Sequence, residues 1–293
     1  MTGWSGRRLA VGVILGTLLF VVAVGLTAAL LGPRLPFGRD RVAVIVVEGV
    51  ITDARHVIEQ LHRYRDLPSV KAVVLRINSP GGAVAPSQEI YQEILKFRQE
   101  AKKPVVASMG SVAASGGYYI AAAADRIVAN PGSLTGSIGV IMQIPNLGGL
   151  MQKVGIKATV IKSGENKDLA SVTRDLTDSE RRILQEVLDD VHAQFIDAVA
   201  AGRHMDRSRV EPLADGRIFS GRQALRLGLV DELGDLSDAV GRAGALVGIA
   251  GRPKVIQERR RGFSLWELLT ESLGPVLPTG GTTPRMLLQY LWQ

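Results

Sequence analysis

The chain has 293 residues, enough for one large domain or two small ones with a substantial core. It contains no cysteine, which excludes disulfide bonds, thiol nucleophiles and thiolate metal sites. Its formal net charge is +7 and its sequence pI about 9.9, yet no nucleic-acid recognition module accompanies this charge, so we expect no nucleic-acid partner.

The N-terminal region carries an uncharged, almost wholly apolar run over residues 9–31. This run is long enough to cross the hydrocarbon core of a bilayer as one helix. A cleavable signal peptide, with a weak site at Thr27-Ala28-Ala29, is the alternative, but its apolar region is normally shorter. We therefore expect a retained single-pass anchor. Arginines flank the run on both sides, so charge counting leaves its orientation open.

Strands and helices alternate after a short linker. The runs 42–47 and 72–77 are rich in β-branched and other apolar residues, which is typical of strands buried on both faces. Helical patterns follow each of them, at 53–66 and 87–102, and Pro104 opens a third strand. This alternation predicts an α/β fold of βαβ units around a largely parallel sheet.

The second half of the chain contains one long helix and several shorter elements. Thr177 and Glu180 have the spacing of a capping box, which predicts the start of the long helix. We also expect further strands, short closing segments and a last helix at 125–129, 158–161, 218–221, 229–232 and 236–247. The sequence thus divides into an anchor and linker (1–41), an α/β domain (42–250) and an amphipathic tail (251–293).

The residue that points most directly to chemistry is Ser115. It follows a run of small residues after the third strand and precedes Gly116 and Gly117. Such a turn can present a hydroxyl with backbone N–H groups close by, which suits a nucleophile. The alternative is a small residue that permits tight packing of helix on sheet. Ser111 is a rival nucleophile, but no Gly-Gly pair follows it.

Acyl transfer also needs a base and N–H donors for the oxyanion. No histidine lies in an obvious position, so the candidate bases are Lys167 and Lys162, between which spacing does not decide. A serine activated by lysine is a known variant of the triad, provided that burial lowers the lysine pKa. The N–H groups of Gly116 and of the Gly81-Gly82 pair could form an oxyanion hole, although 78–82 could equally be an ordinary turn.

Four motifs in this order resemble those of the bacterial signal peptide peptidase A family, in its short, single-copy form. They are the stretches 78–82, 110–119, 132–140 and 162–168, and the resemblance extends over residues 42–247. It implies the spiral fold shared by Clp protease and crotonase. It also implies that Ser115 is the nucleophile, that Lys167 rather than Lys162 is the base, that Ser137 hydrogen-bonds the lysine, and that Gly81 and Gly82 form the glycine turn of the site.

The same resemblance implies a membrane-tethered catalytic domain outside the cytoplasm that assembles as a homo-oligomeric ring. A neighbouring subunit would then supply the lysine. The implied substrates are apolar peptides, chiefly signal-peptide remnants, and we expect no cofactor and no metal. Residues 138–142 and Val84 could line an apolar pocket or belong to the core. A crotonase-like acyl-CoA enzyme and a non-catalytic membrane scaffold are the competing functions.

Overall fold

The computed structural model of the chain describes residues 15–23, 40–258 and 289–291, which divide between two units, Met1–Arg39 and Asp40–Gln293. In the first unit, residues 15–23 are helical with exposed side chains. Most of the apolar run 9–31 lies outside the described residues. Among the helices that are described, none is both long and apolar enough to cross a membrane. The membrane anchor therefore stays a prediction.

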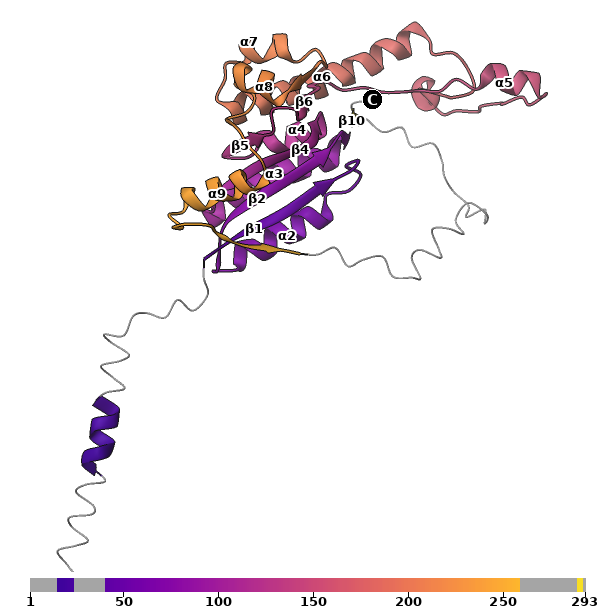
Figure 1. Cartoon of the computed structure of the whole chain (residues 1–293). Helices are drawn as coiled ribbons and strands as arrows, with labels where there is room; N and C mark the ends of the chain where they lie inside the picture. The colour runs from indigo at the N-terminus through magenta and orange to yellow at the C-terminus, as the bar shows by residue number, and fades with distance from the viewer. Residues whose placement is uncertain (1–14, 24–39, 259–288, 292–293) are drawn as a thin grey trace, which may run out of the picture. The chain divides into compact units, whose positions relative to one another are not determined.

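The second unit is built on a largely parallel sheet, which has eight strands in the described part of the chain (Figure 1). Its centre is formed by β1 (Arg41–Glu48), β2 (Val70–Ser79) and β4 (Val105–Ala114). The strand order is β7 (Ile218–Ser220), β6 (Leu134–Gly136), β4, β2, β1 and β9 (Lys254–Gln257). Two further strands, β5 (Arg126–Ala129) and β8 (Glu232–Leu233), join through the first half of β4. The second half of β4 pairs with β6, so the sheet forks along this strand.

Helices cover both faces of the sheet. The helices α2 (Arg55–Asp66), α3 (Val84–Ala101) and α4 (Gly116–Ala122) bury one face, and α9 (Leu236–Leu246) covers the other. Successive residues of a strand point to opposite faces. Accordingly Ala43 and Ile45 belong to the first core cluster and Val42 and Val44 to the second. The predicted α/β fold, with strands buried on both faces, is confirmed.

The long helix α6 (Asp178–Arg203) begins at the predicted capping box. The Thr177 hydroxyl accepts from the Glu180 N–H at 3.2 Å, and the Glu180 carboxylate accepts from the Thr177 N–H at 2.9 Å. Further along, Phe195 and Val199 are fully buried in the core. The helix therefore has a fixed start and a fixed position on the body of the unit.

The other described elements are short. They are β3 (Gly81–Ala83), β5 (Arg126–Ala129), β6 (Leu134–Gly136), α5 (Gly148–Lys153), the 3-10 helix η1 (Glu165–Asp168), α7 (Arg207–Val210), η2 (Glu211–Leu213), β7 (Ile218–Ser220), α8 (Gly221–Leu227), β8 (Glu232–Leu233), β9 (Lys254–Gln257) and β10 (Gln289–Leu291). The strand β9 starts beyond residue 250 and pairs with β1 at the sheet edge. The main sheet thus includes residues that the sequence analysis assigned to the tail.

One predicted strand is wrong. Residues 158–161 form no strand and belong to an extended segment of residues 142–176, the arm, which also carries α5 and η1. Figure 1 shows α5 extending away from the sheet. Ile161 is 96% exposed. The β-branched residues here have the composition of a strand but no neighbouring strand to pair with, and strand preference depends on such packing.

Candidate active site

Ser115 lies on a strained turn between β4 and α4. Its backbone angles are φ 53° and ψ −119°, a region that residues with a side chain rarely adopt. The turn is held on both sides, since the Ser115 N–H donates to the Gly136 carbonyl and the Ser115 carbonyl accepts from Tyr119 N–H, both at 2.8 Å. Strain of this kind costs about 1–3 kcal/mol and clusters at functional sites.

The hydroxyl of Ser115 is buried and has no hydrogen-bond partner in the described part of the chain. Buried polar atoms are nearly always paired, so an orphan on a strained turn calls for an explanation. Ser111, the rival nucleophile, is exposed on a bulge of β4. The geometry therefore singles out Ser115 rather than Ser111 as the candidate.

The glycine motif lies beside this turn. The predicted turn at 78–82 is wrong in detail, because β2 continues to Ser79 and β3 resumes at Gly81 with only Pro80 between them. Ser79 pairs with Ala113 of β4. A Cβ on Gly117 would lie 3.0 Å from the Ser79 carbonyl oxygen, so the two motifs approach closely only because Gly117 lacks one.

The strand β3 has one edge against Ile51 and the other against β10. Ile51 N–H donates to Gly81 carbonyl at 2.9 Å, and Ala83 N–H donates to Ile51 carbonyl at 2.7 Å. Because successive N–H groups of a strand point to opposite edges, the Gly82 N–H faces the edge where β10 pairs antiparallel. That edge therefore accepts an extended chain next to the candidate nucleophile.

Ser137 is brought next to Ser115 by the pairing of β4 with β6, in which Ala114 lies opposite Gly136. Like Ser115, Ser137 is buried with a positive φ, here 50°. Its N–H donates to the Arg217 carbonyl at 2.8 Å, which fixes the turn after β6. Two serines that are 22 positions apart in the sequence thus share one end of the sheet.

A cavity of about 500 Å³ opens beside Ser137. Val140 and Ile141 line it, together with Leu188 and His192 of α6. Ile138 and Val84, which the sequence also offered as pocket residues, are buried in the core instead. Gln185, Asp189 and Asp215 line the rest of it, so the cavity wall is mixed, with an apolar part formed by Val140, Ile141 and Leu188.

His192 of α6, which is partly exposed, also lines this cavity. Its Nε2 is buried and has no partner among the described residues. Helical spacing places it on the same face as Leu188, but only the tertiary structure puts that face opposite Ser137. Elsewhere in the described chain, no group of three or more histidine or acidic side chains could hold a metal ion.

Lys167 lies on the arm, in η1, and is exposed. No hydrogen bond joins it to Ser115 within the described chain, because the Ser115 hydroxyl has no partner at all there. Lys162 differs from it: its amine donates to Asp168 Oδ1 at 2.5 Å and to the Glu165 carbonyl at 2.7 Å. These contacts occupy the Lys162 amine and hold the loop together.

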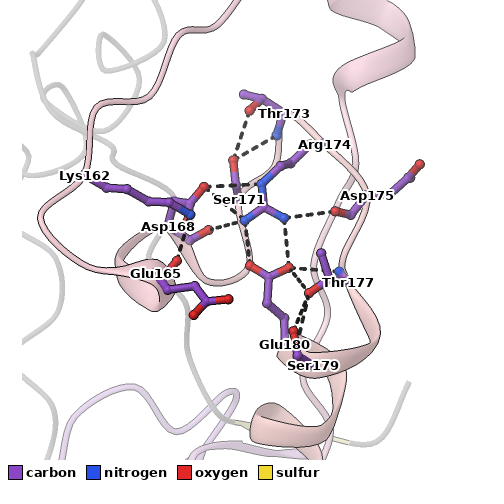
Figure 2. A network of polar contacts seen from close by, with 10 residues as sticks. All are labelled: Lys162, Glu165, Asp168, Ser171, Thr173, Arg174, Asp175, Thr177, Ser179 and Glu180. Carbon is purple, nitrogen blue, oxygen red and sulfur yellow. Dashed lines mark hydrogen bonds and ion pairs between the residues drawn. The ribbon is translucent and has the colours of Figure 1, made fainter.

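A network centred on Arg174 joins the lysine loop to the start of α6, as Figure 2 shows. The guanidinium of Arg174 donates to Asp168 and to Glu180. Hydrogen bonds from Lys162 and Arg174 hold the Asp168 pKa below its usual value. Hydrogen bonds from Arg174 and from the Thr177 N–H lower the Glu180 pKa to about 2. Both carboxylates are therefore ionised at neutral pH.

Comparison with known proteins gives a consistent result. Residues 97–250 match the family described as peptidase family S49. The chain is 45% identical over 212 residues to a Synechocystis protein named "Putative protease slr0021", covering 72% of this chain and 76% of that protein. It is 37% identical to the Enterococcus faecium protein named "Putative signal peptide peptidase SppA" (68% of this chain, 62% of that protein). It is 35% identical to the Arabidopsis thaliana chloroplastic serine protease SPPA, covering 80% of this chain and 36% of that protein.

Proposed function

This chain belongs to peptidase family S49, and we propose that it is a membrane-anchored serine endopeptidase with Ser115 as nucleophile and Lys167 as general base. One observation carries the proposal. The Ser115 hydroxyl is buried without a partner in the described chain, on strained backbone next to the Gly81–Ala83 strand and Ser137. Such a hydroxyl is available to a base that arrives from elsewhere.

In the proposed reaction the neutral amine of Lys167 takes the Ser115 proton while Oγ attacks the scissile carbonyl carbon. The N–H groups of Gly116 and of the Gly81-Gly82 strand stabilise the resulting oxyanion. When the C–N bond breaks, the lysine ammonium gives its proton to the leaving amine and an ester remains on Ser115. Water, deprotonated by Lys167, then hydrolyses the ester and restores the serine.

We propose that Lys167 of one copy serves Ser115 of its neighbour in a homo-oligomeric ring. In support, Lys167 is exposed on the arm whereas Ser115 is buried at the end of β4. The arm also carries exposed apolar side chains of the kind that a second copy would cover. They are Leu147, Leu150, Val154, Ile156, Val160 and Ile161. In this arrangement Ser137 would hydrogen-bond the incoming amine and orient it.

The proposed substrates are extended apolar peptides, chiefly signal-peptide remnants left in a membrane. Two features support this class. Residues 289–291 already pair with β3 as an extended chain would, and one part of the cavity beside Ser137 is formed by the apolar side chains of Val140, Ile141 and Leu188. An anchor at 9–31, with the catalytic unit outside the cytoplasm, would hold the enzyme near such peptides. We also assign the unit to the spiral fold of Clp protease and crotonase.

Covalent labelling tests the proposed nucleophile. A fluorophosphonate probe should modify the full-length protein at Ser115, identified by mass spectrometry, and Ser115→Ala should abolish that labelling. In Lys167→Ala, Ser115 should stay unlabelled or be labelled much more slowly, because the site would lack its base. The chain contains no cysteine thiol that could react in its place. Modification of Ser111 instead, or a peptidase activity that survives in Ser115→Ala, would overturn the mechanism. Acyl-CoA turnover without labelling would identify the crotonase-like alternative.

A further inference from the structure

Arg174 joins two parts of the chain through its guanidinium. On one side is the loop that carries Lys167, and on the other is the first turn of α6. The Arg174 guanidinium donates to Asp168 Oδ2 at 3.0 Å through Nη2 and at 3.3 Å through Nε. It also grips Glu180, with Nη1 to Oε2 at 2.8 Å and Nη2 to Oε1 at 2.6 Å.

We propose that Arg174 is the positioning residue for Lys167, holding η1 against the first turn of α6 through Asp168 and Glu180. The proposal rests on the proposed function, since it takes Lys167 as the base. It adds a residue that would not touch the substrate and yet sets where the base is presented. Figure 2 shows the guanidinium between the two carboxylates.

The contacts of Arg174 with Asp168 and Glu180 form a clamp between η1 and α6. The α6 side of this clamp is rigid. The Glu180 side chain is only 6% exposed and also accepts from the Thr177 N–H, so it is held in the capping box as well as by Arg174. The helix that follows is anchored in the core by Phe195 and Val199. A fork–fork pair between arginine and carboxylate fixes orientation as well as distance. Arg174 therefore binds the loop to a helix whose own position is fixed.

Without the clamp, the loop that carries Lys167 would be mobile. Lys167 is exposed, and the arm around it has exposed apolar side chains and no paired strand at 156–162. Asp168, the next residue, is only 13% exposed because Arg174 and Lys162 both bind it. A base that must reach a neighbouring subunit gains most from being placed in advance, since misplacement by about 1 Å can cost on the order of 100-fold in rate.

The clamp stays charged at neutral pH. The pKa values of Asp168 and Glu180 are both lowered, Glu180 to about 2, and the arginine cation persists above neutral pH. The other charged side chains of the loop are Lys162 and Glu165, and only Lys162 is bound to Asp168. Arg174 and both carboxylates are therefore charged at the neutral pH of a peptidase assay.

The test compares Arg174→Met with Arg181→Met in the full-length, assembled protein. Arg181 is exposed one turn into α6, and no side-chain hydrogen bond or ion pair is found for it among the described residues. We expect Arg174→Met to lose about 10- to 100-fold in kcat for peptide hydrolysis with KM changed less than about twofold. Arg181→Met should match the wild type. Arg174→Lys, which keeps the charge but not the fork, should lie between the two.

The split between kcat and KM separates positioning from a purely structural role. Unfolding or loss of assembly would lower the thermal midpoint and the amount of active enzyme, whereas a misplaced base lowers the kcat of enzyme that stays folded. We therefore expect the Arg174→Met deficit to persist after correction for the folded fraction, with partial recovery in Arg174→Lys. Wild-type kcat in Arg174→Met, or a deficit that disappears after this correction, would overturn the proposal.

Asp168→Asn keeps the test valid if Arg174→Met fails to assemble. It removes the charged link to the loop but leaves the contact between Arg174 and Glu180, and the cap of α6, in place. The same selective loss in kcat is expected, and a wild-type kcat would refute positioning. Lys167→Ala, measured alongside, identifies failure of the underlying mechanism: if that variant stays active, the proposed function is wrong whatever Arg174 does.

Discussion

The backbone N–H of Ser115 donates to the carbonyl oxygen of Gly136 at 2.8 Å, so the turn that carries the candidate nucleophile is fastened to the residue before Ser137. Both serines have positive φ angles and are buried. Neither conformation would persist alone, because each costs free energy that the surrounding strand pairing must offset. The two turns therefore depend on each other and on the pairing of β4 with β6.

Ser115→Ala should abolish peptide hydrolysis while leaving folding and assembly intact, because the hydroxyl makes no hydrogen bond in the described chain. The measurement is turnover of an apolar fluorogenic peptide, with size-exclusion chromatography to check assembly. Ser111→Ala is the matched control, since Ser111 is exposed on the β4 bulge, and it should keep wild-type turnover. The reverse pattern would show that the wrong serine was chosen.

Lys167→Ala should be as inactive as Ser115→Ala, whereas Lys162→Ala should retain most activity. Lys162 binds Asp168 and the Glu165 carbonyl, and Arg174 still holds Asp168 when Lys162 is removed. Steady-state kcat and KM of both variants provide the measurement. An inactive Lys162→Ala beside an active Lys167→Ala would exchange the roles of the two lysines.

Mixing Ser115→Ala with Lys167→Ala subunits should restore part of the activity. Each mixed interface can pair an intact serine from one copy with an intact lysine from the other if the site is shared. The mixture should be unfolded, refolded together and assayed, with native mass spectrometry to establish that mixed assemblies form. No recovery in assemblies known to be mixed would favour a site completed within one chain.

Ser137→Ala should lower kcat by about 10- to 100-fold without a comparable change in KM. A hydrogen bond to a charged partner contributes about 1.5–3 kcal/mol, which corresponds to that range of rates. Ser133→Ala is a useful contrast, because Ser133 Oγ donates to the Gly110 carbonyl at 2.6 Å and has a structural partner. That variant should lose about 1 kcal/mol of unfolding free energy while the folded enzyme keeps its kcat.

Gly82→Ala should destabilise the fold and abolish activity. A Cβ at this position would lie 2.1 Å from the Ile51 carbonyl oxygen, so β3 would have to shift by more than a side-chain adjustment. Overpacking of this kind costs about 1–3 kcal/mol or more. Gly149→Ala, in α5 with nothing within 4 Å of the added Cβ, should leave activity unchanged. A Gly82→Ala protein with wild-type thermal midpoint and kcat would disprove the close approach.

The Arg174 clamp should weaken only below about pH 4.5. The Glu180 pKa falls from its ordinary value of 4.5 to about 2 in the folded chain, so its stabilising effect is fully present above pH 4.5. This effect is lost as the pH falls from about 4.5 toward 2. Urea midpoints of wild type and Glu180→Gln should differ at pH 6 and converge near pH 2. Parallel midpoints across this range would contradict the assigned pKa.

The strongly patterned parts of the fold were predictable because their local and tertiary preferences agree. The β-branched runs of β1 and β2 became central strands, and the capping box at Thr177 and Glu180 starts α6. Prediction failed where the two preferences conflict. Residues 158–161 have strand composition without a partner strand, and the segment 78–82 looks like a turn but is drawn out by pairing with Ile51 and Ala113.

The candidate site likewise contains some residues that the sequence identifies and others that only the structure reveals. Ser115 and the glycines can be named from their local motifs, because tight turns need particular residue types. Ser137, and Lys167 rather than Lys162, are named only through the family resemblance. His192 and Arg174 could not be found in this manner. Their importance depends on which surfaces face them, namely the cavity beside Ser137 and the carboxylates of Asp168 and Glu180.

By itself the sequence determined the α/β class, the family and the identities of the candidate catalytic residues, since periodicity and short motifs are local properties of a chain. Only the tertiary structure decided that Ser115 is buried without a partner in the described chain and that Lys162 is bound to Asp168. It also placed Lys167 on an exposed arm clamped to α6 through Arg174. The physical reason is that burial, strand pairing and ion pairing depend on residues far apart in sequence, whose approach no local pattern encodes.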